Sequence, residues 1–227
     1  MSALFQPFKL KDVTLRNRIA IPPMCQYVAV EGLINEWHQV HLAGLARGGA
    51  GLVIVEATAV APEGRITPGC AGIWNDGLAQ AFAPAVAAIK AAGAVPGLQI
   101  AHAGRKASAN RPWEGDDQMA ADDPRGWPTL APSAIPFGAN LPKVPQAMTL
   151  DDIARVRQDF VVPPNGPGTS ASSGWSCTSP TATWGKAFSR LIPTSGKMPM
   201  AAAWRTAAAF WWRPWPRCAR CGPSICP

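Results

Sequence analysis

The stretch Gly51-Leu-Val-Ile-Val-Glu-Ala-Thr-Ala59 is a continuous apolar run interrupted by a single glutamate. A run of this kind, without alternation of polar and apolar residues, is typical of a parallel β-strand covered on both faces. Val95-Pro-Gly-Leu-Gln-Ile-Ala-His102 has the same character further along the chain. The two runs predict parallel strands, and parallel strands need a crossover connection between them.

The segments beside these runs have helical patterns. Glu36 to Arg47 repeats apolar residues at helical spacing, and Gly48-Gly49 follows as a helix end. Leu78 to Ala92 is Ala-rich and is predicted to form one helix that ends at Gly93. Ahead of both, Ile19 to Met24 predicts a buried strand that is stopped by prolines.

Three other segments frame this core. FKLKDVTLRNR, from Phe8 to Arg18, alternates around a Lys-Asp turn and predicts a short hairpin. Ala103 to Ala147 is a long excursion rich in Pro and Trp. Thr149, with Asp152 as its capping-box partner, begins a further helix. The apolar side chains on one face of that helix are Ile153, Val156 and Phe160.

The order strand, helix, strand, helix, strand, helix predicts an α/β fold built from parallel β/α units. A doubly wound nucleotide fold has a glycine-rich turn after its first strand, but Pro22-Pro23-Met24-Cys25 stands there. A (β/α)8 TIM barrel is therefore favoured. Closed barrels usually need roughly 250 residues, so the length of 227 does not by itself decide the fold. The β/α pattern before residue 162 accounts for only the first three to four units of a barrel. Barrel active sites lie at the C-terminal strand ends, which are Met24 to Tyr27, Ala57 to Thr58 and Gln99 to Arg105.

A break in composition divides the chain after residue 161. All 14 acidic residues precede residue 162, whereas residues 162–227 hold seven basic residues and six of the 10 Trp. We therefore expect 1–161 to be the ordered barrel part and 162–227 to be an irregular tail. The net charge of +7 belongs to the tail, so it gives no reason to expect nucleic acid or membrane as a partner of the ordered part.

Several side chains at the expected strand ends can carry chemistry. The Cys25 thiol follows a proline-stiffened strand end, although residue type alone fits a small buried hydrophobic side chain equally well. Tyr27 adds a phenol. Gln99 offers a donor and an acceptor on one planar group, which suits the edge of a heterocycle. An amide inside an apolar strand also needs a partner to justify its burial.

The histidines and cysteines do not predict a metal site. His38 and His41 lie three residues apart on a predicted helix, but no third His and no carboxylate joins them at a strand end, so structural roles are favoured. Cys218-x-x-Cys221 has zinc-knuckle spacing, but the tail contains no His, and chance spacing is the better interpretation. For His102, a site role and a structural role are equally supported. The charged cluster Glu114 to Asp123 is expected to be a solvated surface.

Three motifs together resemble the Old Yellow Enzyme family. They are Pro22-Pro23-Met24-Cys25-Gln26-Tyr27, then Val55-Glu-Ala-Thr-Ala59 with Gly64-Arg65, and Gln99-Ile-Ala-His102-Ala-Gly-Arg105. The resemblance covers residues 1–161 and is closest to the bacterial xenobiotic reductase branch. It implies an FMN-linked TIM barrel that uses NADPH or NADH to reduce activated C=C bonds of enone-type substrates. It also implies a homo-oligomer for an intact member.

The resemblance assigns roles to individual positions. Residues matching Pro23, Met24, Cys25 and Ala57 pack on or hydrogen-bond the flavin ring, and the residue matching Gln99 bonds its pyrimidine edge. The cysteine tunes the flavin potential, and the residues matching Tyr27 and Ile66 border the substrate. In the family, hydride passes from nicotinamide to flavin N5 and on to the substrate β-carbon, while two histidines polarise the carbonyl.

Those two histidines belong to a fourth-strand segment resembling His-Phe-Ala-His-Gly-Tyr-Leu-Gly-Gln, which this chain does not contain. Cys177-Thr-Ser-Pro-Thr-Ala-Thr-Trp-Gly-Lys186 stands there instead. If the last base of each of these codons is read with the first two bases of the next, all nine family residues are allowed in register. The hypothesis is a frameshift near Val161 or Val162, with residues 162–227 translated out of frame and no catalytic residue intact.

Two functions remain in competition. The first is an FMN-dependent ene-reductase whose encoded chain is truncated and inactive. The second is a basic segment that binds membranes or nucleic acid through interleaved Trp and Arg between Trp204 and Arg220. The first residues, MSALFQPFKLKDV, match neither a signal nor a transit peptide, so a cytoplasmic location is expected.

Overall fold

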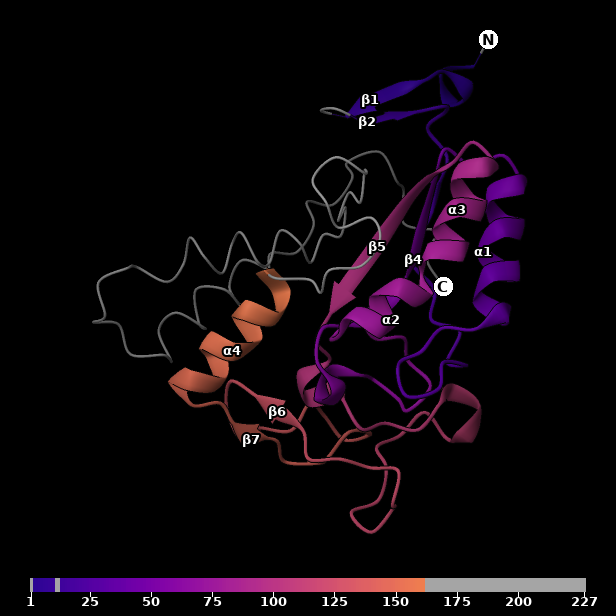
Figure 1. The fold of residues 1–227 in the computed structure, drawn as a ribbon. Helices are drawn as coiled ribbons and strands as arrows, with labels where there is room; N and C mark the ends of the chain where they lie inside the picture. The colour runs from indigo at the N-terminus through magenta and orange to yellow at the C-terminus, as the bar shows by residue number, and fades with distance from the viewer. Residues whose placement is uncertain (1, 11–12, 162–227) are drawn as a thin grey trace, which may run out of the picture. The chain divides into compact units, whose positions relative to one another are not determined.

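A parallel three-stranded sheet forms the centre of the computed structural model, which describes residues 2–10 and 13–161. The strands are β3 (Ala20–Ile21), β4 (Leu52–Ala59) and β5 (Val95–Ala101), in the order β3-β4-β5. Ala20 lies opposite Leu52, which lies opposite Val95. The predicted parallel arrangement is therefore confirmed (Figure 1). The expected tail, 162–227, lies outside the described residues.

One layer of helices covers one face of this sheet. Helix α1 (Glu36–Arg47) connects β3 to β4, while α2 (Asp76–Ala81) and α3 (Ala83–Ala91) connect β4 to β5. Figure 1 shows α1 and α3 side by side, and they pack on β4 and β5 respectively. The interior between sheet and helices is apolar. Its members include Leu42, Ala46, Val53, Val55, Phe82, Val86, Ile89 and Leu98.

Helix α1 has the bounds that the sequence predicts, because both of its ends carry capping signals. The Asn35 side chain accepts from the Trp37 N–H at 3.1 Å. The Nδ1 atom of His38 accepts from the Asn35 N–H at 3.1 Å, which completes a reciprocal cap. Gly48 ends the helix.

Strand β3 is shorter and less covered than predicted. The expectation of a buried strand from Ile19 to Met24 is wrong, because only Ala20–Ile21 pairs and Ala20 is exposed. Two causes act together. Pro22 and Pro23 have no N–H to donate to a ladder, and among the described strands β3 has a partner on one side only.

The single helix expected from Leu78 to Ala92 is also wrong. Two helices, α2 and α3, meet at Phe82, which ends the first and begins the second. Pro84 stands in the first turn of α3, where its missing N–H is tolerated but could not continue a helix from α2.

Shorter elements complete the described part. The predicted hairpin is confirmed as the antiparallel pair β1 (Phe8–Leu10) and β2 (Val13–Leu15), preceded by η1 (Ala3–Phe5). The excursion after β5 contains η3 (Gly104–Lys106), η4 (Pro112–Glu114) and a parallel pair, β6 (Leu130–Ala131) with β7 (Gln146–Ala147). A further single turn, η2 (Pro62–Gly64), follows β4.

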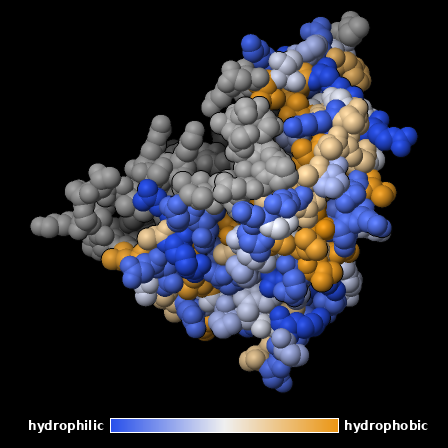
Figure 2. Space-filling model, viewed as in Figure 1, coloured by the Kyte–Doolittle hydropathy of each residue, from blue (hydrophilic) through white to orange (hydrophobic). Residues whose placement is uncertain are grey.

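Helix α4 (Leu150–Val161) begins as predicted. The Thr149 hydroxyl donates to Asp152 at 2.6 Å, and the Asp152 N–H donates back to that hydroxyl at 3.1 Å. Phe160 packs against the apolar core. At the surface of the molecule, Figure 2 shows hydrophobic residues interspersed with hydrophilic ones. None of the helices within 2–10 and 13–161 combines the length and the apolar character needed to cross a bilayer.

Candidate functional site

A β-bulge at Glu56 decides which side chains occupy the sheet face opposite the helices. Val53 and Val55 point toward the helices, and Leu98, which pairs with Val55, does the same. The pairing register shifts between Val55 and Ala57, so that Glu56 is an extra residue. A bulge re-aims the side chains that follow it. As a result Ala57 pairs with Gln99 on the face away from the helices.

Gln99 therefore lies beside Ala57 near the C-terminal end of the sheet. Both residues are half-buried, in contrast to the fully buried Val55 and Leu98 before them. The Gln99 side-chain amide makes no hydrogen bond to a residue within 2–10 or 13–161. The sequence prediction that the ends of β4 and β5 bring these two residues together is confirmed, and a planar amide is left open for a ligand.

The turn after β3 lies next to the bulge. The Gln26 N–H donates to the Glu56 carboxylate at 2.8 Å, and the Gln26 side chain bonds the Met24 carbonyl at 2.9 Å. The Trp37 indole donates to the other end of the same amide at 3.1 Å. These bonds fix the path of the chain through Pro23, Met24 and Cys25. Met24 remains 47% exposed, which leaves an apolar surface at the strand end.

Glu56 and His38 form a buried pair that sequence reasoning did not identify as part of the site. Their side chains are 3% and 1% exposed, and Nε2 of His38 lies 3.8 Å from Oε1 of Glu56. Nδ1 of His38 lies 3.1 Å from the Asn35 backbone nitrogen and 3.0 Å from the Asn35 side-chain oxygen, so that Nε2 is the ring nitrogen that faces Glu56. A small cavity of about 10 Å³ adjoins both groups. His38 is thus a structural histidine, as predicted.

Cys25 is not an isolated thiol. It lies close enough to Cys70 for the two thiols to shift each other's pKa, and Cys70 is buried and had no sequence signal that would select it. The pKa of Cys25 is raised, first by its bond to Cys70 and then by burial. The pKa of Cys70 is lowered to about 6, chiefly because Cys25 and Thr67 donate hydrogen bonds to its sulfur. The proton of the pair is therefore held on Cys25.

The two residues expected to border a substrate lie on separate loops. Tyr27 has a positive φ of 57°, which is unusual for a residue with a side chain, and its ring meets Trp113 edge-on with centroids 5.9 Å apart. Burial raises the pKa of Tyr27 to about 12. Ile66 is half-buried, and its carbonyl accepts from Ala109 at 2.9 Å.

His102 and Arg105 follow β5 and make different kinds of contact. Nδ1 of His102 accepts from the Gly104 N–H at 3.2 Å, while its buried Nε2 has no hydrogen-bond partner among the described residues. Burial lowers the pKa of His102. Arg105 donates to the Ile135 carbonyl at 2.7 Å and to the Ser133 hydroxyl at 2.6 Å. The Arg105 side chain therefore holds the loop between Ala103 and Ala147 in place and does not face the open side of the sheet.

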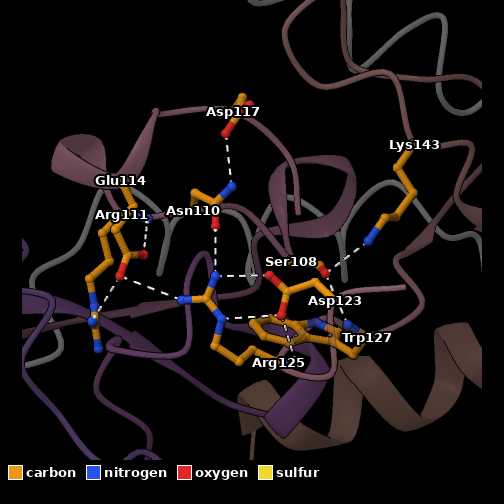
Figure 3. A network of polar contacts seen from close by, with 9 residues as sticks. All are labelled: Ser108, Asn110, Arg111, Glu114, Asp117, Asp123, Arg125, Trp127 and Lys143. Atoms are coloured by element: carbon orange, nitrogen blue, oxygen red, sulfur yellow. Dashed lines mark hydrogen bonds and ion pairs between the residues drawn. The ribbon is translucent and has the colours of Figure 1, made fainter. Parts of the chain in front are cut away.

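The excursion after β5 is held by a polar network (Figure 3). Arg125 binds both Asp123 oxygens, at 2.8 and 3.1 Å, and the pKa of Asp123 is lowered by these bonds. The buried hydroxyl of Ser108 accepts from the Trp127 N–H and from Lys143. The charged cluster expected as a plain solvated surface is exposed in large part, but it is organised by these pairs. No group of three or more metal-ligating side chains occurs within 2–10 and 13–161.

Known proteins with similar sequences are flavin oxidoreductases. The sequence profile of the NADH:flavin oxidoreductase / NADH oxidase family matches residues 3–163. An NADH:flavin oxidoreductase from Gibberella zeae is 41% identical over 160 residues, which are 70% of this chain and 39% of that protein. An NADPH dehydrogenase from Bacillus velezensis is 43% identical over 159 residues, which are 69% of this chain and 42% of that one.

Solved structures agree with the sequence comparison. Morphinone reductase has a TM-score of 0.57 and 27% identity over 70% of this chain and 42% of its own. The Old Yellow Enzyme homologue from Zymomonas mobilis has a TM-score of 0.56 and 29% identity over 70% of this chain and 43% of its own. These neighbours confirm the predicted TIM-barrel class for the described part.

The chain spans about two fifths of the length of the curated relatives that it matches. Over that span the family profile, the relatives and the structural neighbours all give the same assignment, to oxidoreductases that work with FMN and a nicotinamide reductant. The chain, whose described part has a three-stranded parallel sheet with Ala57 and Gln99 at neighbouring strand ends, belongs to the NADH:flavin oxidoreductase / NADH oxidase family, the family of Old Yellow Enzyme.

Proposed function

We propose that the gene for this chain encodes an FMN-dependent NAD(P)H oxidoreductase that reduces activated C=C bonds of α,β-unsaturated carbonyl compounds. The observation that carries the proposal is the pairing of Ala57 with Gln99 on the open face of the sheet. Two strand ends there meet a turn that leaves the Met24 side chain exposed. Side chains with this arrangement suit a flat heterocycle with one polar edge.

The residues present fit the flavin ring. Pro23, Met24 and Cys25 would supply an apolar edge and a thiol, and the small Ala57 side chain leaves room for a ring against the sheet. The open amide of Gln99 would bond the polar edge through one donor and one acceptor. FMN, when bound, supplies the centre that accepts hydride from NAD(P)H and delivers it to the substrate. Tyr27 and Ile66 are proposed to border that substrate.

The Glu56–His38 pair stabilises the turn that lies next to this face of the sheet. Glu56 accepts the Gln26 N–H at 2.8 Å and so holds the turn that carries Cys25. Its Oε1 and the facing Nε2 of His38 lie too far apart, at 3.8 Å, for a direct hydrogen bond. We propose that the pair positions the cofactor-facing turn and does not itself contact the cofactor.

We further propose that residues 162–227 are translated out of frame. The shifted frame beneath Cys177 to Lys186 allows the nine-residue family segment that carries two histidines. That frame begins one base earlier than the translated one, so a single base lost near codon 162 would explain the change. Inserting one base near codon 162 would restore the family reading frame, and we call the product of that corrected gene the frame-restored protein. The chain as written has neither histidine, and we propose that it is inactive.

The experiment compares the two proteins after identical purification. The central sheet of the described residues has three parallel strands, and an open parallel sheet cannot bury its core completely. It is expected to lose FMN on gel filtration, whereas the frame-restored protein should remain yellow with stoichiometric FMN and oxidise NADPH or NADH with an enone. Stoichiometric FMN on the written chain, or a frame-restored protein without flavin, would overturn the proposal.

A second candidate function rests on the composition of the tail. Trp204, Trp211, Trp212 and Trp215 are interleaved with arginines and no acids, a pattern suited to an anionic surface. A synthetic peptide of residues 200–227 would bind anionic vesicles in a salt-sensitive way under this reading. The same composition arises by default when a GC-rich gene is read out of frame, so we favour the oxidoreductase.

A further inference from the structure

Two segments far apart in sequence run side by side and bring two cysteines together. The Ala29 N–H donates to the Gly69 carbonyl at 3.0 Å. Gly69 also packs directly on the Tyr27 carbonyl, where any Cβ would collide. These contacts hold the turn after β3 against the loop after η2, and they bring the thiols of Cys25 and Cys70 close enough together for each to shift the pKa of the other.

The sulfur of Cys70 lies among hydrogen-bond donors. The Thr67 N–H donates to it at 3.3 Å, and the Thr67 hydroxyl oxygen lies 3.5 Å away. That hydroxyl already accepts from the Gly69 N–H at 3.2 Å, which leaves its proton free to point at the sulfur. Donors on a buried sulfur favour the thiolate, and they lower the pKa of Cys70. Cys70 is 1% exposed, while Cys25 is partly exposed.

We propose that Cys25 and Cys70 form an oxidisable thiol pair, which hydrogen peroxide converts into an intramolecular disulfide. Each sulfur also interacts with a neighbouring residue, Cys70 with Thr67 and Cys25 with the Ala57 backbone, and these contacts hold the two thiols in place. The accessible member can meet the oxidant, and the buried member is held in contact with it as the resolving thiol.

The chemistry balances with one peroxide for each pair. As the Cys25 sulfur attacks one peroxide oxygen, its proton passes to the Cys70 sulfur, the O–O bond breaks and hydroxide leaves. This gives Cys25 sulfenic acid and Cys70 thiol. The Cys70 sulfur then attacks the Cys25 sulfur, the S–O bond breaks, and the departing hydroxide takes the Cys70 proton and leaves as water. Two sulfurs are oxidised by one electron each, and peroxide is reduced by two.

The test uses the full 227-residue chain and needs no flavin. The reduced protein is treated with one equivalent of hydrogen peroxide, remaining thiols are alkylated, and the unreduced tryptic digest is analysed by mass spectrometry. Trypsin releases Cys25 in peptide 19–47 and Cys70 in peptide 66–90, each with a single cysteine. The expected result is a disulfide linking these two peptides, in excess of every other disulfide.

Two controls make the outcome decisive. Cys70→Ser should abolish the linked peptide, and Cys177→Ser, in the tail, should leave its yield unchanged. The same oxidation in guanidinium chloride should spread Cys25 over several partners. The proposal fails if native and denatured protein give equal yields of the linked peptide, if Cys25 pairs mainly with tail cysteines, or if Cys25 is overoxidised without forming the disulfide. Flavin retention plays no part in these readings, so they stand apart from the proposed function.

Discussion

Replacing Gln99 with alanine in the frame-restored protein removes an amide that the central sheet leaves open on the face away from its helices, where we propose that FMN binds. Gln99 lies opposite Ala57 in the strand register. Its side chain has no hydrogen-bond partner among the described residues, so removing it leaves no internal group unsatisfied. The fold should therefore be unaffected. Up to two hydrogen bonds to FMN are lost, each contributing about 0.5–1.5 kcal/mol.

The expected cost is about 1–3 kcal/mol of binding free energy, which is a rise in the FMN dissociation constant of about 5- to 150-fold. Fluorescence titration of FMN measures it directly. Gln80→Ala, on the exposed surface of α2, is the matched control and should bind as the parent does. An unchanged dissociation constant for Gln99→Ala, with circular dichroism also unchanged, would refute the assignment of Gln99 to the flavin edge.

Three further predictions concern the same frame-restored protein. Ala57→Leu fills the face beside Gln99 and should raise the FMN dissociation constant, measured by fluorescence titration, by about 5- to 150-fold. Ala79→Leu, on the helix side, should lower the thermal stability instead, which thermal melts would show. Arg16 donates to the carbonyls of Ala46, Ala50 and Ala92 at 2.8–3.1 Å, so Arg16→Ala should lower the unfolding free energy by about 2–3 kcal/mol. The matched control Arg18→Ala, whose guanidinium lies over the Phe8 ring, should lower it by about 0.5 kcal/mol, and equal losses in urea titrations would contradict this. Because burial lowers the pKa of His102 below its ordinary 6.5, the unfolded chain binds the extra proton first, and stability should fall as pH drops below about 6.5. His102→Gln should flatten that part of the pH dependence, and an unchanged slope between pH 7.5 and 5.0 would count against it.

Local signals were sufficient for much of the fold. Helix α1 has its predicted bounds because Asn35 and Gly48 flank an amphipathic run, and α4 begins at the Thr149–Asp152 box. The split between α2 and α3 was also legible, since Pro84 stands inside the Ala-rich run. The shortened β3 was harder to foresee, because its exposure depends on which strands lie beside it and not on its own apolar residues.

The site was predictable only in part. The placement of Ala57 beside Gln99 followed from strand ends that face the same way, but the bulge that turns Ala57 outward has only one sequence signal, the lone Glu56 in an apolar run. Cys70 had no local signal at all, because its contact with Cys25 depends on how two distant loops pack. Tertiary contacts of this kind cannot be obtained from spacing along the chain.

The nucleotide sequence from codon 155 to codon 186 can establish whether the flavin site once continued into a fourth strand. If the shifted frame encodes the two histidines, codon 177 must be TGC and codon 180 must be CCC, because Thr178 and Thr181 each begin with AC. We predict both codons, with the other seven residues of the family segment in register. A different third base in either codon would contradict the frameshift and leave the tail as a genuine part of the protein.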